Sequence, residues 1–226
     1  MKGVTDKTGA VLEAISRLEC IKAYTLVGGT ALALQLENRE SEDLDFMSWV
    51  QKANDRRDVN WPQIKKELET VGTVEKVDIL DFYHVEFIVN GVKLSFYANP
   101  NKSPVKEGIP YLNNIKLADV KSIGAMKMEV LLRRSKFRDY YDIFSIMKNG
   151  IDINEMISLA LAYSGHKLKS KNLIAILTQS DRFLPDQTFA TLNPVYNITP
   201  KEIEEEIKKR INASSMQIKC SRGFKL

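Results

Sequence analysis

The chain has little cysteine, little histidine and no long apolar run. Cys20 and Cys220, its two cysteines among 226 residues, lie far apart and form no CxxC pattern, so we expect free thiols rather than a disulfide or zinc site. His84 and His166 stand outside any catalytic or metal motif, which argues against zinc and histidine-base chemistry. A membrane-spanning run and a signal-peptide apolar region are also missing, so we expect a cytoplasmic protein with no membrane partner.

Several common site signatures are absent as well. The sequence has no GxxxxGK[ST], no GxGxxG and no GxSxG, which excludes the usual P-loop, dinucleotide and serine-hydrolase motifs. The formal net charge of +4, from 33 basic and 29 acidic residues, permits nucleic-acid binding without requiring it. The length and a hydrophobic content of 44% suit one large or two small globular domains.

The most informative stretch is an apolar strand, Leu26-Val27, that runs into Gly28-Gly29 and then a helix. Free backbone N–H groups and the positive end of a helix together bind phosphate well. A simple tight turn explains one glycine but explains two less well, so we favour phosphate contact. Thr30 is placed to cap the helix or to bind phosphate, and the two roles are compatible.

A pair of aspartates follows on the next strand, which we expect over residues 43–48. Side chains two residues apart on a strand share one face, so Asp43 and Asp45 aim at one site while Leu44 and Phe46 point into the core. Two exposed acids on a strand or loop are the plain alternative, but aspartate is depleted in strands. Two carboxylates beside a phosphate cradle therefore predict a site for Mg²⁺, or Mn²⁺, and a nucleotide.

Basic residues collect in the second half of the chain. Lys127, Arg134 and Arg138 lie at offsets of seven and four, which keeps them on one face if the helix is continuous. A solvated basic face and a wall for a triphosphate or an RNA end are both open interpretations. Further cations occur nearby and in the tail: Lys116, Lys121, Arg133, Lys136, Lys167, Lys169, Lys171, Lys219, Arg222 and Lys225.

The periodicity predicts an α+β protein with two domains. Residues 1–108 alternate helices and strands, including a hairpin at Asn90-Gly91, and should form a mixed sheet flanked by helices. Residues 109–226 read as mainly helical, with helices expected over 118–134 and 137–148, and should complete a cleft. Thr199-Pro200-Lys201-Glu202 has the pattern of a capping box.

Three motifs in order resemble one known family. They are GGTALAL, RESEDLDF, and KMEVLLRRSKFRDYYD from Lys127 to Asp142, and the resemblance covers roughly residues 20 to 150. The chain is similar to the DNA-polymerase-β-like nucleotidyltransferases, and among them to the AbiEii/AbiGii abortive-infection toxins.

The resemblance implies an enzyme and its site. A divalent metal on Asp43 and Asp45 would hold an NTP, and a hydroxyl would displace pyrophosphate at the α-phosphorus. Lys127 and Asp142 join the catalytic residues by the same resemblance. Gly28, Gly29, Thr30, Arg134 and Arg138 become nucleotide-binding candidates, while Asp139 is either a partner of these cations or part of the site.

One element of the superfamily pattern is not matched. A third carboxylate often stands on a later strand, where this chain has Ser95. Glu86, or Asp78 on an earlier strand, is a substitute to consider.

The resemblance also implies the biological setting. It suggests the toxin of a bacterial toxin–antitoxin pair, with RNA as acceptor, most plausibly the 3′ end of tRNA, and a cognate antitoxin protein as partner. An antibiotic-type nucleotidyltransferase acting on a small molecule and a non-catalytic binding protein on the same fold are the alternatives.

Overall fold

The chain folds into two compact units, Met1–Ile123 and Gly124–Leu226. The computed structural model describes residues 1–49, 58–100, 103–105, 108–165 and 167–222, with backbone alone for 214–222. The expected polar loop at 50–59 therefore lies largely outside the described residues, as do His166 and the side chain of Cys220.

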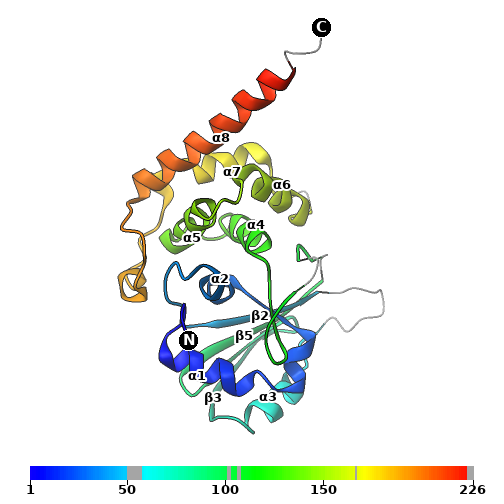
Figure 1. Cartoon of the computed structure of the whole chain (residues 1–226). Coiled ribbons are helices and arrows are strands. Elements are labelled where there is room, and N and C mark those ends of the chain that lie inside the picture. Colours follow the sequence, from blue (N-terminus) through cyan, green and yellow to red (C-terminus); the bar gives the residue numbers. More distant parts are fainter. Residues whose placement is uncertain (50–57, 101–102, 106–107, 166, 223–226) are drawn as a thin grey trace. The chain divides into compact units, whose positions relative to one another are not determined.

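The first unit is a seven-stranded mixed sheet with helices on both of its sides (Figure 1). The strand order is β3-β4-β5-β2-β1-β7-β6, with β2 parallel to β5 and antiparallel to β1. Its strands are β1 Thr25–Val27, β2 Leu44–Trp49, β3 Val74–Asp81, β4 His84–Val89, β5 Val92–Asn99, β6 Ile109–Leu112 and β7 Ile115–Leu117. Its helices are α1 Asp6–Ile15, α2 Gly28–Leu36 and α3 Trp61–Leu68, with the 3₁₀ helix η1 at Glu19–Ala23.

The sheet has an apolar face and a polar face. Phe46 of β2 and Phe96 of β5 stack with ring centroids 5.2 Å apart, and neither is exposed to solvent. The alternate residues Asp45 and Ser95 point the other way, because successive side chains on a strand alternate between faces. Figure 1 shows α2 on one side of the sheet and α1 and α3 on the other.

The β4–β5 hairpin forms as predicted. Asn90 and Gly91 have φ of 47° and 68°, as a type I′ turn requires. The turn fixes the register that pairs Glu86 with Ser95, and β5 in turn pairs Ser95 with Asp45 of β2.

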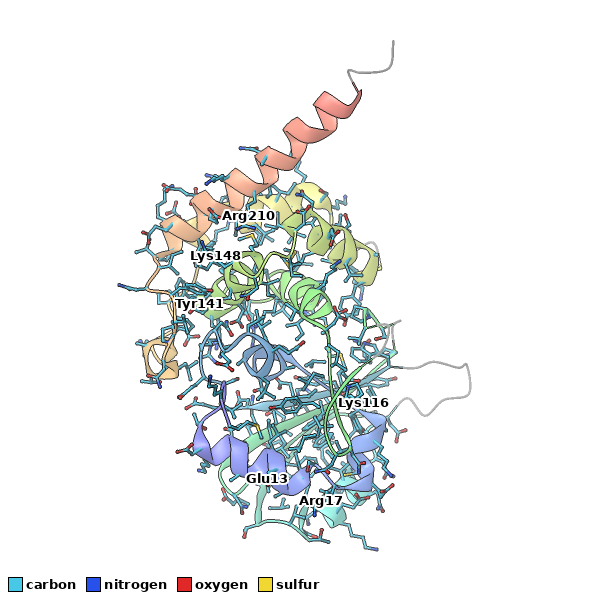
Figure 2. The ribbon with its side chains drawn as sticks, viewed as in Figure 1. Glu13, Arg17, Lys116, Tyr141, Lys148 and Arg210 are labelled. Atoms are coloured by element: carbon cyan, nitrogen blue, oxygen red, sulfur yellow. The ribbon has the colours of Figure 1, made fainter. Side chains whose placement is uncertain are left out.

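The second unit is helical. It holds the end of α4 (Val120–Val130), and then α5 Phe137–Lys148, α6 Ile153–Tyr163, α7 Ser170–Leu177, η2 Ser180–Arg182, η3 Phe189–Leu192 and α8 Pro200–Arg222. α8 packs against α5 and α6. Arg210 of α8 donates from Nη1 to the carbonyl of Met147 at the end of α5 (2.9 Å), close to Lys148 in Figure 2.

Aromatic side chains fill the interior of this unit. Tyr140 and Tyr141 are fully buried, and the Tyr140 ring stacks on Phe183 with centroids 3.5 Å apart. They are core residues of this unit. The capping box at the start of α8 is also confirmed, since Glu202 N–H donates to Thr199 Oγ1 and Thr199 N–H donates to the Glu202 carboxylate.

The predicted fold class is confirmed, with two local differences. Residues 109–117 form the hairpin β6–β7 of the sheet rather than the start of a helical half, so the first unit extends to Ile123. The helix expected over 118–134 ends at Val130, and α5 begins at Phe137. The condition for a shared face of Lys127, Arg134 and Arg138, a continuous helix through all three, is therefore not met.

Candidate active site

The turn between β1 and α2 depends on both of its glycines. Gly28 has a φ of 69°, and a Cβ there would lie 2.7 Å from Asp45 Oδ2. A Cβ on Gly29 would lie 2.5 Å from Arg39 Nη2. A side chain at either position would therefore collide with a neighbouring side chain, so glycine lets the Asp45 carboxylate and the Arg39 guanidinium approach the backbone of the turn. The first N–H groups of α2, which have no intrahelical acceptor, begin at this turn.

The two predicted metal-binding aspartates lie at the start of β2. Asp45 pairs with Val27 of β1 on one side and with Ser95 of β5 on the other. Asp43 immediately precedes the strand, and its side chain is 45% exposed. Leu44 between them is fully buried. The alternation predicted from sequence thus holds, and Asp45 lies next to Gly28.

Thr30 has a different local role from the one its sequence context suggested first. Its side chain is buried, and its hydroxyl hydrogen-bonds Ser41 Oγ (2.8 Å) and contacts the carbonyl of Asp43. The hydroxyl therefore ties α2 to the loop that carries Asp43. Its place as a nucleotide-binding residue remains a prediction.

The α2–β2 loop is tied from a second direction. Thr8 of α1 donates from Oγ1 to the carbonyl of Glu42 (2.9 Å), and the N–H of Thr5 donates to the carbonyl of Ser41. The neighbouring carbonyls of Ser41 and Glu42 are thus held by a backbone N–H and by a buried threonine hydroxyl. This bonding fixes the approach of the chain to Asp43.

A row of polar residues crosses the sheet from Asp45. The register aligns Asp45 with Ser95 of β5, Glu86 of β4 and Asp78 of β3. Ser95 donates to Glu86 Oε1 at 3.4 Å, whereas Asp78 contacts Lys76 on the edge strand at 2.6 Å. Of the two substitutes considered for a third carboxylate, Glu86 lies one strand nearer to Asp45.

Two further side chains meet Glu86 on this face. Lys93 Nζ lies 3.8 Å from Glu86 Oε1 and 3.6 Å from Asp43 Oδ2. His84 Nε2 lies 3.3 Å from the same Glu86 oxygen, and its ring stacks on Tyr97. Sequence reasoning did not single out Lys93, although its i−2 spacing from Ser95 on the predicted strand was a usable signal.

A buried charge cluster forms in the second unit. Lys127 is 6% exposed, and its Nζ lies 3.1 Å from Asp139 Oδ1 and 2.7 Å from Asp142 Oδ2. Arg134 donates to both oxygens of Asp139, at 3.1 and 3.3 Å. Both aspartates are fully buried. The structure thus brings together three predicted site residues and shows Asp139 as the acceptor that joins two of them.

Arg138 contacts a further aspartate. It pairs with Asp186, with Nη2 2.9 Å from Oδ1, and donates to Thr188 Oγ1. Its guanidinium lowers the pKa of the Asp186 carboxyl. Arg134 and Arg138 diverge because the chain turns between α4 and α5.

Cysteine and metal expectations can be checked over part of the chain. Cys20 is a free thiol, and burial together with the Glu67 carboxylate raises its pKa to about 12.

Among the described residues, no group of three or more histidine, cysteine, aspartate or glutamate side chains is arranged to hold a metal ion. In the same part of the chain, no helix is both long and apolar enough to cross a membrane.

Comparison with known proteins identifies relatives over nearly the full length. The family model described as "Nucleotidyl transferase AbiEii toxin, Type IV TA system" matches residues 10–218. An uncharacterized protein of Aquifex aeolicus (strain VF5) is 27% identical over 219 residues, which cover 93% of this chain and 97% of that protein.

Two solved structures are also similar. MenT4, a nucleotidyltransferase toxin of Mycobacterium tuberculosis H37Rv, superposes with a TM-score of 0.59 at 17% identity, over 88% of this chain and 79% of that one. At this identity the likeness shows the fold alone. JHP933 of Helicobacter pylori is 14% identical over 95% of this chain and 94% of its own, with a TM-score of 0.45, and supports no argument.

Proposed function

The chain belongs to the AbiEii nucleotidyl transferase toxin family, and from that premise we propose a metal-dependent transfer of NMP from an NTP to an RNA acceptor. The family match confirms the resemblance predicted from the motifs and the prediction of a nucleotidyltransferase toxin, and the family description adds that the toxin–antitoxin system is of type IV. The observation that supports the proposed chemistry best is the contact between the glycine turn at Gly28 and the carboxylate of Asp45.

Asp43 and Asp45 are the proposed ligands of Mg²⁺ or Mn²⁺. Their carboxylate oxygens are the donors these cations prefer, and Mg²⁺ is commonly held by one or two carboxylates together with substrate phosphates. The absence of a side chain at Gly28 lets the Asp45 carboxylate lie close to the backbone of the turn, which would bring a metal ion on Asp45 near the proposed phosphate-binding N–H groups. A bound divalent ion would supply charge neutralisation and Lewis acidity at the triphosphate.

The turn and α2 are the proposed phosphate cradle. The N–H groups of Gly28, Gly29 and Thr30 start a helix, where backbone donors and the positive dipole favour anions. In the reaction, the acceptor oxygen forms a bond to the α-phosphorus, the α–β phosphoanhydride bond breaks, and pyrophosphate leaves. The acceptor hydroxyl loses its proton in this step.

Lys127 and Asp142 remain the proposed catalytic residues of the second unit, with Arg134 and Arg138 as proposed nucleotide-binding cations. The ammonium of Lys127 is shared between Asp139 and Asp142, so its orientation is fixed before substrate arrives. A lysine provides a point charge that suits phosphate without bidentate geometry. The partly exposed guanidinium of Arg134 is more accessible than that of Arg138.

RNA is the proposed acceptor, with the 3′ end of tRNA as the favoured target. Lys167, Lys169 and Lys171 are exposed cations around the start of α7, as binding to a phosphate backbone would require. A cognate antitoxin protein and a cytoplasmic location complete the proposal. RNA binding should weaken steeply with salt because counterions are released, and a flat salt dependence would favour the small-molecule alternative.

The direct test combines the protein with labelled NTPs, Mg²⁺ or Mn²⁺, and total RNA. Labelled RNA in the size range of tRNA is expected, and comparison of the four NTPs would identify the base. Label on a small molecule only would replace RNA as the acceptor. Absence of both transfer and nucleotide binding would favour a non-catalytic binding protein.

A further inference from the structure

The polar face of the sheet carries a lysine directly beside the aspartate pair. Lys93 of β5 places its Nζ 3.6 Å from Asp43 Oδ2 and 3.8 Å from Glu86 Oε1. We propose that Lys93 binds a phosphate group of the nucleotide, and that Glu86 is the positioning residue that holds it there. This inference rests on the proposed function.

The charge on this face shows why a cation is needed. Asp43, Asp45 and Glu86 contribute three carboxylates, and Lys93 contributes one ammonium among them. A triphosphate approaching the aspartates would meet net negative charge. Asp43 would hold a divalent ion together with a phosphate of the nucleotide, and the Lys93 ammonium lies on the same side as the Asp43 carboxylate.

A comparison with Arg39 favours Lys93 for this role. Arg39 also borders the turn, but it is 4% exposed and packs against Gly29, while its Nη1 donates to the carbonyl of Glu40. The Lys93 side chain is 37% exposed. A flexible lysine at the surface can move toward a ligand, whereas a buried guanidinium is held by the surrounding protein.

The contacts of Glu86 suit it to orienting the Lys93 side chain. Its Oε1 faces the ammonium of Lys93, the hydroxyl of Ser95 and Nε2 of His84. Ser95 of β5 pairs with Glu86 across the strands and donates its hydroxyl to Glu86 Oε1. The ammonium is therefore held between Glu86 on one side and Asp43 on the other.

A purely neutralising lysine would behave differently from a phosphate-binding one. If Lys93 only compensates the carboxylates, its removal should strengthen binding of a cation to Asp43 and leave nucleotide affinity unchanged. If Lys93 binds phosphate, its removal should weaken nucleotide binding, and the loss should persist at saturating metal.

The test measures binding of a fluorescent ATP analogue at saturating Mn²⁺, and Mn²⁺ binding without nucleotide, on the full chain. Lys93→Ala should weaken nucleotide binding by roughly ten- to a hundred-fold, and Lys93→Arg by less. Glu86→Gln should cause a smaller loss of nucleotide affinity. In the double variant it should add nothing to the loss caused by Lys93→Ala, because Glu86 acts through Lys93. Lys76→Ala is the matched control, because Lys76 also pairs with an aspartate on this sheet but lies on the edge strand β3.

Outcomes separate this inference from the proposed function. Suppose that Lys93→Ala binds the nucleotide within about twofold of wild type and of Lys76→Ala, whereas Asp45→Ala binds it poorly. This result would overturn the role of Lys93 and leave the proposed function standing. If Lys93→Ala binds Mn²⁺ more tightly but its nucleotide affinity is unchanged, Lys93 only neutralises the neighbouring carboxylates. Failure of the wild type to bind the analogue overturns both.

Discussion

The Oδ2 atom of Asp45 lies 2.7 Å from the point that a Cβ on residue 28 would occupy. This relationship couples the two motifs that are most informative in the sequence. The glycine allows the left-handed backbone of the turn, and the missing side chain lets the carboxylate lie against that backbone. The proposed phosphate cradle and the proposed metal ligand are therefore parts of one local arrangement.

Gly28→Ala should reduce nucleotide transfer more than it reduces stability. The positive φ of 69° costs an alanine about 1–2 kcal/mol, and the added Cβ displaces the Asp45 carboxylate. A misplacement of about 1 Å in a reacting group can lower the rate by roughly a hundred-fold. Transfer assays and thermal unfolding of the same preparation measure the two effects.

Gly150→Ala is the control for this substitution. Gly150 also has a positive φ, 88°, but nothing lies within 4 Å of its Cβ position. Gly150→Ala should lose stability because alanine is strained at this positive φ, and it should keep its transfer activity. Equal activity in the two variants would mean that displacement of Asp45 does not matter.

Lys127→Ala should destabilise the second unit strongly. The substitution leaves Asp139 and Asp142 fully buried with less compensating charge, and removal of one partner of a buried ion pair typically costs about 3–5 kcal/mol. Arg134→Ala should cost clearly less, because the Arg134 side chain is 51% exposed. Chemical denaturation gives both values, and similar losses in the two variants would contradict this ranking.

The expected destabilisation also determines how an activity test of Lys127 must be designed. Loss of transfer in Lys127→Ala alone would not separate a phosphate contact from local unfolding. The double variant Lys127→Met with Asp142→Asn removes one charge of each sign and retains the apolar volume. It should restore much of the stability, and a continued absence of transfer would then indicate a role in chemistry.

Thr30→Val should lower both stability and transfer, whereas Thr30→Ser should retain most of each. Valine cannot hydrogen-bond Ser41 Oγ or the carbonyl of Asp43, and an unsatisfied buried group costs about 1–3 kcal/mol. The loop that carries Asp43 would loosen as a result. Thermal unfolding and the metal concentration needed for transfer would report the change, and equal behaviour of the two variants would refute the hydroxyl's role.

The Arg138–Asp186 pair should contribute to stability in a pH-dependent way. Hydrogen bonding from Arg138 lowers the pKa of Asp186 in the folded protein. The stabilisation is therefore complete above the unfolded-state pKa of about 3.9 and is lost as the pH falls through the lower folded-state value. Asp186→Asn should unfold at a lower temperature than wild type at pH 7, and the difference should shrink below about pH 4. A difference that stays constant with pH would contradict the pair's role.

Local sequence patterns predicted the part of the site that depends on local geometry. The glycine turn, the alternation around Leu44 and the Asn90-Gly91 hairpin each depend on residues within a few positions, and all appear in the structure as expected. The β6–β7 hairpin was not predicted. Its strands are short, and the turn at Asn113-Asn114 lacks the glycine that marks the first hairpin.

Tertiary contacts determined the rest. The pairing of Lys127 with Asp139 and Asp142 depends on the chain turning back between α4 and α5, so a single-helix projection could not reveal it. The alignment of Glu86 with Asp45 depends on the pairing of β5 with β2, and these two strands are far apart in sequence. The motifs and their spacing identified these residues as candidates, but the tertiary fold was needed to show which of them lie together.

The most direct test of the account replaces Asp45 with asparagine and measures incorporation of labelled NMP into RNA at increasing Mn²⁺ concentration. Asparagine keeps the size of the side chain and removes the charge, so the fold should be retained, as circular dichroism would show. We predict a loss of transfer of at least roughly a hundred-fold, equivalent to about 2.7 kcal/mol of transition-state stabilisation. Transfer at the wild-type rate, with the same dependence on metal, would contradict the assignment of the active site.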